Sequence, residues 1–237
     1  MDIRGSTVFV TGANRGIGLA FAREALSRGA SKVYAGMRNT KGFSVDGLVP
    51  VSLDVTDQGS VDAAAARCGD TTLLVNNAGI ARTMDGPLDE RMEAMSRELF
   101  ETNYYGMIRV TRAFVPGLAA RGDAGIINVL SSATWRSIPA LAAYAASKAA
   151  AWSFTNTLRL QLQLSSQRIQ VLALHVGFVD TDLARDVDRP KSSPLDVVSQ
   201  TFDALVAGED EVFADSGTKE LKRGLSATPA SYIGSHR

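Results

Sequence analysis

The sequence lacks the residues that mark disulfide-rich and metal-binding proteins. Its single cysteine, Cys68, excludes an internal disulfide framework and a cysteine-rich metal site. The two histidines have no partners at the spacing of metal ligands, so we predict no catalytic metal. We expect His175 to end a strand and His236 to lie in the C-terminal tail.

The sequence also lacks a charge imbalance and a long hydrophobic run. Lys plus Arg and Asp plus Glu both number 25, so the formal net charge is zero. Without a basic excess we predict no nucleic-acid partner and no membrane partner. No stretch approaches the roughly 20 apolar residues that span a bilayer. The first residues contain no apolar core of a signal peptide, so we expect a cytoplasmic protein.

Apolar residues make up 45% of the 237 residues and charged residues 21%, which suits one large globular domain. No repeat or linker divides the chain, so we predict a single domain over 1–237. Short apolar runs predict strands at 7–10, 32–35, 48–53, 73–75, 125–130, 169–175 and 211–214. Helices are expected at 19–28, 61–67, 90–121, 140–165 and 195–207, with breaks near Pro87 and Pro116.

Strands and helices alternate throughout, and the strands are continuous apolar runs rather than alternating ones. This pattern is typical of a parallel sheet that is covered on both faces. A glycine-rich turn, Thr11-Gly12-Ala13-Asn14-Arg15-Gly16-Ile17-Gly18, follows the first strand and opens a helix. Such a turn lets the backbone approach a pyrophosphate, which the helix N-terminus also attracts. We therefore predict a Rossmann-type, doubly wound α/β fold with about seven strands.

Tyr144 and Lys148 are one helical turn apart, so their side chains share a face of the predicted helix. A phenol is a poor acid or base near neutral pH, but a nearby cation favours the phenolate and lowers its pKa. The hydroxyl of Ser131, thirteen residues before Tyr144, could hydrogen-bond the same substrate oxygen. The three groups together suit proton transfer between a carbonyl and an alcohol.

These motifs resemble the short-chain dehydrogenase/reductase family, in its compact one-domain branch, over about residues 5–185. The motifs occur in the family's order: Thr11-Gly12-x3-Gly16-x-Gly18, Asp54-Val55, Asn76-Asn77-Ala78-Gly79, Asn103, Ser131, Tyr144-x3-Lys148 and Gly177-x3-Thr181. Seven motifs in register, each at a strand end or on a helix, are a specific signal.

The resemblance implies that Tyr144 is the acid/base, that Ser131 orients the substrate carbonyl, and that Lys148 lowers the tyrosine pKa. It also implies that Asn103, a poor helix former within a predicted helix, joins a proton relay to solvent. Ser132 is adjacent to Ser131, and the family's spacing to the tyrosine favours Ser131.

The resemblance also implies a cofactor site, in which Asp54 meets the adenine amino group and Thr181 holds the nicotinamide carboxamide. Asn76 could contact the ribose or could equally be a structural hydrogen-bonding residue. The residues assigned to cofactor binding are Gly12, Asn14, Arg15, Gly16, Ile17, Gly18, Arg38, Asp54, Val55, Asn77, Ala78, Gly79, Tyr144, Lys148, Gly177, Val179 and Thr181.

NADP(H) is the predicted cofactor, because Met37 stands where NAD-selecting members carry an acid at the end of the second strand. An acid would repel a 2′-phosphate, whereas the guanidinium of Arg38 can bind it with two hydrogen bonds. Arg15, in the glycine turn, adds a second cation, as in NADP-preferring members.

The substrate is less defined. The loop at 182–194 is short and charged, and it is either a mobile lid or a solvated loop. Trp135 and Phe178 are candidate apolar walls, although large aromatic residues more often belong to the core. We expect a small-molecule carbonyl or alcohol as the substrate.

The sequence departs from the family at Val176, where proline is usual. It also departs near its C-terminal end, where the glycine-rich segment that many tetrameric members use for an interface is reduced to Ser216-Gly217. We therefore expect a homodimer through the two long helices, with a tetramer possible. Residues 216–237 form either a tail or a covering helix. One alternative is a non-catalytic NADP-binding regulator, and the intact Ser131, Tyr144 and Lys148 argue against it. The other is a different enzyme class on this fold, such as a dehalogenase, against which the retained tyrosine and glycine turn argue, or an epimerase, for which the length provides no larger substrate domain.

Overall fold

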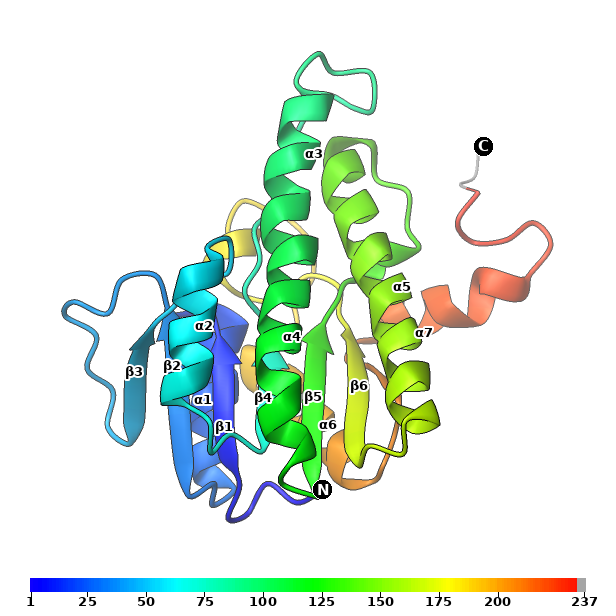
Figure 1. Cartoon of the computed structure of the whole chain (residues 1–237). Helices are drawn as coiled ribbons and strands as arrows, with labels where there is room; N and C mark the ends of the chain where they lie inside the picture. The colour runs from blue at the N-terminus through cyan, green and yellow to red at the C-terminus, as the bar shows by residue number, and fades with distance from the viewer. Residues whose placement is uncertain (234–237) are drawn as a thin grey trace.

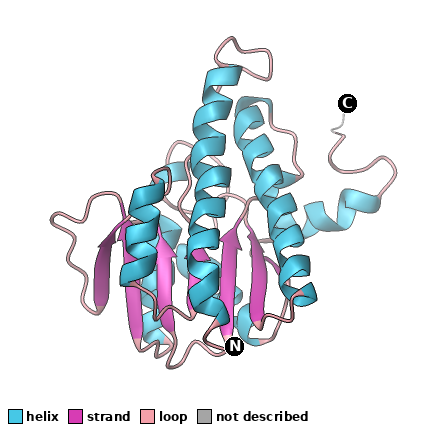
Figure 2. Ribbon diagram, in the orientation of Figure 1, coloured by secondary structure: helices cyan, strands magenta, loops and turns pink. Residues whose placement is uncertain are grey.

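Seven parallel strands run through the middle of the protein, as the computed structural model of residues 1–233 shows (Figures 1 and 2). The strand order in the sheet is β3-β2-β1-β4-β5-β6-β7, and every neighbouring pair is parallel. The strands are β1 Thr7–Thr11, β2 Lys32–Met37, β3 Leu48–Ser52, β4 Leu73–Asn76, β5 Ala124–Val129, β6 Ile169–His175 and β7 Glu211–Phe213. The predicted doubly wound α/β fold is therefore confirmed.

Helices cover both faces of the sheet (Figure 1). The α-helices are α1 Gly16–Ser27, α2 Gln58–Arg67, α3 Met92–Phe100, α4 Gly106–Ala119, α5 Ala142–Leu164, α6 Pro194–Val206 and α7 Ser216–Arg223. One hydrophobic cluster joins the sheet to α1 and α6, and a second joins it to α2, α4 and α5. On β1, Val8 and Val10 belong to the first cluster and Phe9 to the second, which explains the unbroken apolar strand.

The predicted helix over 90–121 is interrupted in the middle rather than near its end. Between α3 and α4, the segment Glu101–Tyr105 forms a π-helical turn. The expected break near Pro116 is wrong, because Pro116 lies inside α4. Burial of Phe114 and Leu118 against the sheet offsets the one backbone bond that proline removes. Among residues 1–233, no helix is both long and apolar enough to cross a membrane.

A ladder of buried polar side chains crosses the sheet beneath the site. The Asn76 amide donates to the Thr111 hydroxyl of α4 at 3.0 Å and to the Asn128 side chain of β5 at 2.9 Å. The Asn128 amide in turn donates to the Thr155 hydroxyl of α5 at 2.9 Å. Asn76 is therefore a structural residue, which decides the question that the sequence left open. The ladder fixes the register of two strands and two helices.

Thr155→Val tests this ladder, because valine keeps the shape but leaves the buried amide of Asn128 without its acceptor. We expect urea unfolding to show that the free energy of unfolding falls by about 1–3 kcal/mol. The matched control is Thr157→Val, since the exposed Thr157 makes the same hydroxyl bond to a carbonyl four residues earlier. Equal stability losses in the two variants would contradict a special role for the ladder.

Candidate active site

The predicted site residues lie at one edge of the sheet, because the carboxyl ends of parallel strands meet there. The loops after β1, β4, β5 and β6 all leave the sheet at this edge (Figure 1). The four central strands thus bring together motifs that are up to 170 residues apart in sequence, from Gly12 to Thr181.

The glycine turn between β1 and α1 requires its glycines. Gly12 and Gly16 have φ angles of +67° and +55°, where side chains are strained. A Cβ on Gly18 would lie 2.3 Å from the Gly12 carbonyl oxygen and 2.5 Å from the Asn77 amide nitrogen. Asn14 is exposed, whereas Ile17 packs against the cluster beneath α1. The turn therefore presents free backbone N–H groups at a helix N-terminus.

Thr11 and Asn77 hold the glycine turn against the segment that follows β4. The Thr11 hydroxyl oxygen accepts hydrogen bonds from the backbone N–H of Asn77 and of Ala78, both at 2.9 Å. The Asn77 side chain donates to the carbonyls of Thr11 at 2.9 Å and Gly12 at 3.3 Å. The side-chain amide of Asn77, assigned above to the cofactor, is thus occupied within the protein. Its backbone role toward the cofactor stays a prediction.

Lys148 is a buried ammonium group, only 5% exposed. Its Nζ donates to the Val129 carbonyl at 2.9 Å and lies 5.8 Å from the centre of the Tyr144 ring. Burial lowers the pKa of Lys148 to about 8. The lysine makes no ion pair within residues 1–233, so its charge is available to a phenolate or a ligand beside it.

Tyr144 and Ser131 meet at the same place. Burial raises the pKa of Tyr144, and the Ser131 hydroxyl, as its side-chain hydrogen-bond partner, acts in the opposite direction. The Ser131 side chain also accepts from the Ala133 backbone N–H at 3.1 Å and caps the 3-10 turn Ser132–Thr134. The expected lowering of the Tyr144 pKa by Lys148 stays a prediction.

Asn103 lies at the centre of the π-helical turn and is 1% exposed. Its Oδ1 accepts from the Ile80 N–H at 2.8 Å, and its Nδ2 donates to the Ile80 carbonyl at 2.9 Å and the Ser147 hydroxyl at 3.0 Å. A Cβ on Gly79 would be 3.2 Å from Asn103 Oδ1 and 3.7 Å from Lys148 Nζ. The fold therefore brings Gly79, Asn103 and Lys148 together.

The end of β2 is cationic. Met37 is buried there, and the exposed Arg38 lies near enough to Asp54 to lower its pKa. The larger causes of that lowering are the hydrogen bonds to Asp54 from the Thr56 N–H at 2.9 Å and hydroxyl at 2.7 Å. Val55 is buried beside Gly106, so one side of it packs on the protein.

The loop after β6 lies against the glycine turn. The Thr181 methyl group would lie 3.3 Å from a Cβ on Gly16, and the Gly177 N–H donates to the Asp215 side chain at 2.8 Å. Arg15 reaches across to this loop and pairs with Asp182 at 3.2 Å. Any anion that binds Arg15 must compete with Asp182.

Trp135 belongs to the interior. Its ring stacks on His175 at 4.2 Å, and only 9% of it is exposed. Phe178 is half-buried. Val179 is buried and pairs with Ser192 across the loop at 182–194. His175 ends β6, as the sequence predicted, whereas His236 lies outside the described residues.

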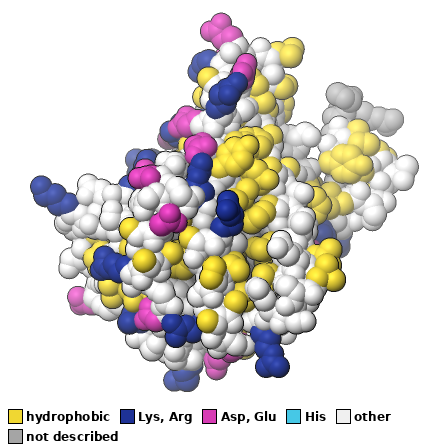
Figure 3. Space-filling view, in the orientation of Figure 1, with side chains coloured by type: hydrophobic (Ala, Val, Ile, Leu, Met, Phe, Trp, Pro, Cys, Tyr) yellow, Lys and Arg dark blue, Asp and Glu magenta, His cyan; other side chains and the backbone are white. Residues whose placement is uncertain are grey.

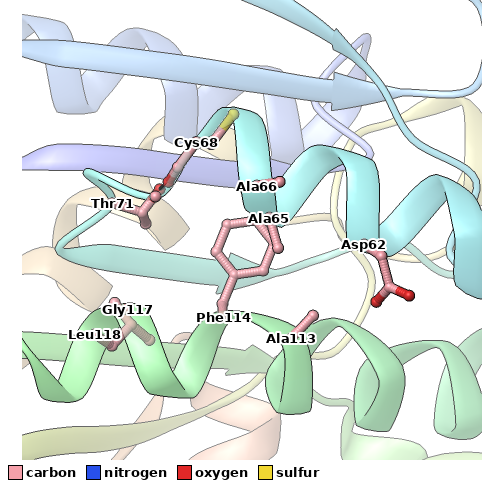
Figure 4. A pocket seen from close by; sticks show the side chains of 10 residues that line it. Asp62, Ala65, Ala66, Cys68, Thr71, Ala113, Phe114, Gly117 and Leu118 are labelled. Carbon is pink, nitrogen blue, oxygen red and sulfur yellow. Dashed lines mark hydrogen bonds between the residues drawn. The ribbon is translucent and has the colours of Figure 1, made fainter.

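A separate pocket lies between α2 and α4, away from these groups (Figure 4). Thr71, which lines it, precedes β4, so this pocket is near the amino ends of the strands. Cys68 also lines it, and burial raises the pKa of the Cys68 thiol to about 11. The thiol is therefore protonated at neutral pH. Within residues 1–233, no three His, Cys, Asp or Glu side chains gather as a metal site.

Residues 6–192 match the family model described as short chain dehydrogenase. The chain belongs to the short-chain dehydrogenase/reductase family. It is thus an oxidoreductase of a family that uses nicotinamide cofactors, which confirms the resemblance of its motifs.

Known relatives cover most of the chain. It is 31% identical to 1-deoxy-11-beta-hydroxypentalenate dehydrogenase of Streptomyces exfoliatus, over 92% of this chain and 86% of that one. It is 30% identical to 3-oxoacyl-[acyl-carrier-protein] reductase FabG of Vibrio cholerae, over 78% of each. A crystal structure of a short chain dehydrogenase from Burkholderia cenocepacia in complex with NADP superposes with a TM-score of 0.90. It is 38% identical and covers 97% of this chain and 96% of its own.

Lys148→Met tests the electrostatic state of the site. The pKa of Lys148 is lower in the folded protein than in the unfolded chain, so the folded state binds fewer protons between about pH 8 and 10.5. Below pH 8 the buried charge lowers the free energy of unfolding by its full amount, about 3 kcal/mol. This penalty disappears as the pH rises to 10.5. Methionine removes this penalty and also loses the bond to Val129, worth about 1 kcal/mol.

We therefore expect Lys148→Met to be about 2 kcal/mol more stable than the wild type at pH 7. The advantage should vanish or reverse by pH 10. Urea unfolding across this pH range measures it, and Lys41→Met, at an exposed lysine, is the control. A variant less stable than the wild type at pH 7 would show that the buried charge is not costly.

Proposed function

We propose that the protein is an NADP(H)-dependent oxidoreductase that interconverts a ketone or aldehyde and an alcohol. The observation that carries the proposal is the meeting of Tyr144, Ser131 and the buried Lys148 at the carboxyl edge of the sheet. A buried ammonium without a carboxylate partner is costly to keep, which favours a chemical role over a structural one.

The residues present fit a dinucleotide. A side chain at Gly18 would collide with the turn that must approach a pyrophosphate, and the α1 N-terminus offers free N–H groups there. The chain would hold the nicotinamide half with Lys148, Tyr144 and the loop after β6. It would hold the adenosine half with Arg38, with the segment Asp54–Val55 after β3 and with Asn77, Ala78 and Gly79 after β4.

The residues of the chain handle the proton. The reduced nicotinamide supplies the hydride when it is bound. The Tyr144 hydroxyl donates a proton to the substrate oxygen, and the Ser131 hydroxyl holds that oxygen in place by a hydrogen bond. Lys148 stabilises the resulting phenolate by its charge, and Asn103, which lies beside the lysine, orders the path by which the proton is replaced.

NADP(H) is favoured over NAD(H) by the cationic end of β2. Arg38 is exposed there, and no carboxylate occupies the position of Met37 to repel a 2′-phosphate. The Burkholderia cenocepacia relative, which is in complex with NADP, supports the same choice.

We further propose that the enzyme is a homodimer that acts on a small molecule in the cytoplasm. Hydrophobic side chains gather over α4 and α5 on the face seen in Figure 3. On α5, Leu160 is 55% exposed and Leu164 is 79% exposed. Exposed leucines of this kind on one helix suit a contact between two copies of the chain.

Tyr144→Phe should lower the turnover of a ketone by about 10²–10⁴, because phenylalanine cannot donate the proton. NADPH affinity should change little, since the ring is kept. Loss of reduced-nicotinamide absorbance measures turnover, and nucleotide fluorescence measures binding. Tyr105→Phe, at an exposed tyrosine, is the control. Retained activity in Tyr144→Phe would remove Tyr144 as the acid, whereas a wild type that binds NADPH and turns over no ketone would favour the non-catalytic regulator.

Arg38→Asp should weaken NADPH binding by at least about tenfold while NADH binding changes far less, because only the 2′-phosphate meets the new charge. Fluorescence titration with each nucleotide gives both dissociation constants. Lys41→Asp makes the same charge change on the exposed loop after β2. An equal loss of affinity for both nucleotides in Arg38→Asp would show that Arg38 does not bind the 2′-phosphate.

A further inference from the structure

An aromatic stack lies at the edge of the sheet, beside the turn that carries Ser131. His175 is fully buried, and its ring stacks on Trp135 at 4.2 Å and on Phe213 at 5.4 Å. Trp152 of α5 meets the Trp135 ring edge to face at 5.7 Å. The stack therefore joins β6, β7, α5 and the turn after β5.

A chain of polar side chains, the His175 ring, the Glu211 carboxylate and the Lys222 ammonium, connects this stack to the C-terminal helix α7. His175 Nε2 lies 3.2 Å from a carboxylate oxygen of Glu211, and the other oxygen of Glu211 lies 3.1 Å from Lys222 Nζ. The same Nζ lies 5.0 Å from the centre of the Trp135 ring and 5.5 Å from that of Phe213. These groups are partly shielded from water, so the pairs are stronger than surface pairs.

The Trp135 ring and the Ser131 hydroxyl belong to one short turn. The backbone N–H of Trp135 donates to the Ser132 carbonyl at 3.2 Å, and the backbone N–H of Ser132 donates to the Val176 carbonyl at 2.9 Å. The Ser131 hydroxyl oxygen caps this turn. A displacement of the Trp135 backbone would therefore be transmitted to the Ser131 hydroxyl through this turn.

Few side-chain hydrogen bonds hold the stack in place. Among the described residues, four buried side-chain N and O atoms have no hydrogen-bond partner, and all four belong to the stack or to the turn beside it: Thr134 Oγ1, Trp135 Nε1, Trp152 Nε1 and His175 Nδ1. Burial lowers the pKa of His175, which favours the neutral ring, and the Glu211 carboxylate and the Ser131 carbonyl oppose this shift only in part. Besides the backbone hydrogen bonds of the turn, ring stacking and the contacts of Lys222 therefore hold the Trp135 side chain in place.

The N-terminus of α7 is tied to the loop after β6. Asp215 caps the helix by accepting from the Thr218 N–H at 2.8 Å and hydroxyl at 2.7 Å. The same carboxylate accepts from the Gly177 N–H at 2.8 Å. Beyond the helix, the Ser137 hydroxyl donates to the Tyr232 carbonyl at 3.2 Å. The segment 215–232, which includes α7, therefore contacts both loops that flank the proposed reaction centre.

We propose that α7 is a positioning element of the active site, in which Lys222 acts through Glu211, His175 and Trp135 to hold the Ser131 hydroxyl in its productive position. Lys222, Glu211 and His175 are positioning residues, and none of them touches the substrate. This inference rests on the proposed function for its effect on turnover, but the structural coupling itself can be measured without a substrate.

Amide hydrogen exchange, read by mass spectrometry, tests the coupling directly. In Lys222→Met, exchange over 131–137 should quicken by about tenfold, while the glycine turn over 12–18 stays as in the wild type. Lys222→Arg keeps the charge and should restore slow exchange. Lys219→Met removes an exposed lysine from the same helix and is the control. Glu211→Gln should reproduce Lys222→Met, and exchange over 131–137 that is unchanged in both variants would overturn the proposal.

Turnover gives the second measurement, with 1-phenyl-1,2-propanedione as the probe ketone. Lys222→Met should lower kcat by about tenfold, while KM and NADPH affinity stay within about twofold. The reason is that a misplaced hydroxyl reduces stabilisation of the transition state more than it reduces substrate binding. Lys222→Arg should recover most of kcat. Faster exchange with an unchanged kcat would overturn the catalytic part of the proposal. A wild type that binds NADPH but never oxidises it would instead overturn the proposed function, whereas the exchange result would still decide whether α7 positions the turn.

Discussion

The close contact between the glycine turn and the segment after β4 is the constraint on which the site depends. Thr11 and Asn77 hold the two segments together by four hydrogen bonds, and Gly18 allows the approach because it has no side chain. This contact sets the depth of the α1 N-terminus relative to the sheet edge. The polar ladder from Asn76 to Thr155 then fixes α5, and with it Tyr144 and Lys148, to the same edge. Binding and chemistry are therefore aligned through one rigid sheet.

Electrostatics give this edge its chemical character. Burial alone would keep Tyr144 protonated and would push Lys148 toward its neutral form, since each pKa is shifted against the charged state. When the phenol gives up its proton and the lysine keeps its own, the two opposite charges attract each other. This attraction offsets part of the free-energy cost of burying each charge. Neither charge is stable alone at this place, and Asn103 lies next to the lysine on a π-helical turn.

Local patterns predicted what depends on local sequence. The apolar strands, the glycine turn and the one-turn spacing of Tyr144 and Lys148 each have a signature within a few residues, and the structure places them on the expected elements. The occupied amide of Asn77 and the inward packing of Trp135 had no such signature. Their partners lie 40 to 90 residues away, on strands and helices whose neighbours only the folded chain reveals. The proposed role of α7 could not be predicted for the same reason, since its partners are distant in sequence. By its composition alone, α7 is a polar helix near the end of the chain.

The most direct test of the central claim is the transfer of a label. The protein would be incubated with NADPH that carries deuterium at the reactive carbon of the nicotinamide and with a panel of aromatic and aliphatic ketones, and the products would be analysed by mass spectrometry. The account predicts an alcohol that carries one deuterium on its carbinol carbon, and no such product from Tyr144→Phe. Saturable NADPH binding without a labelled alcohol from any ketone would contradict it.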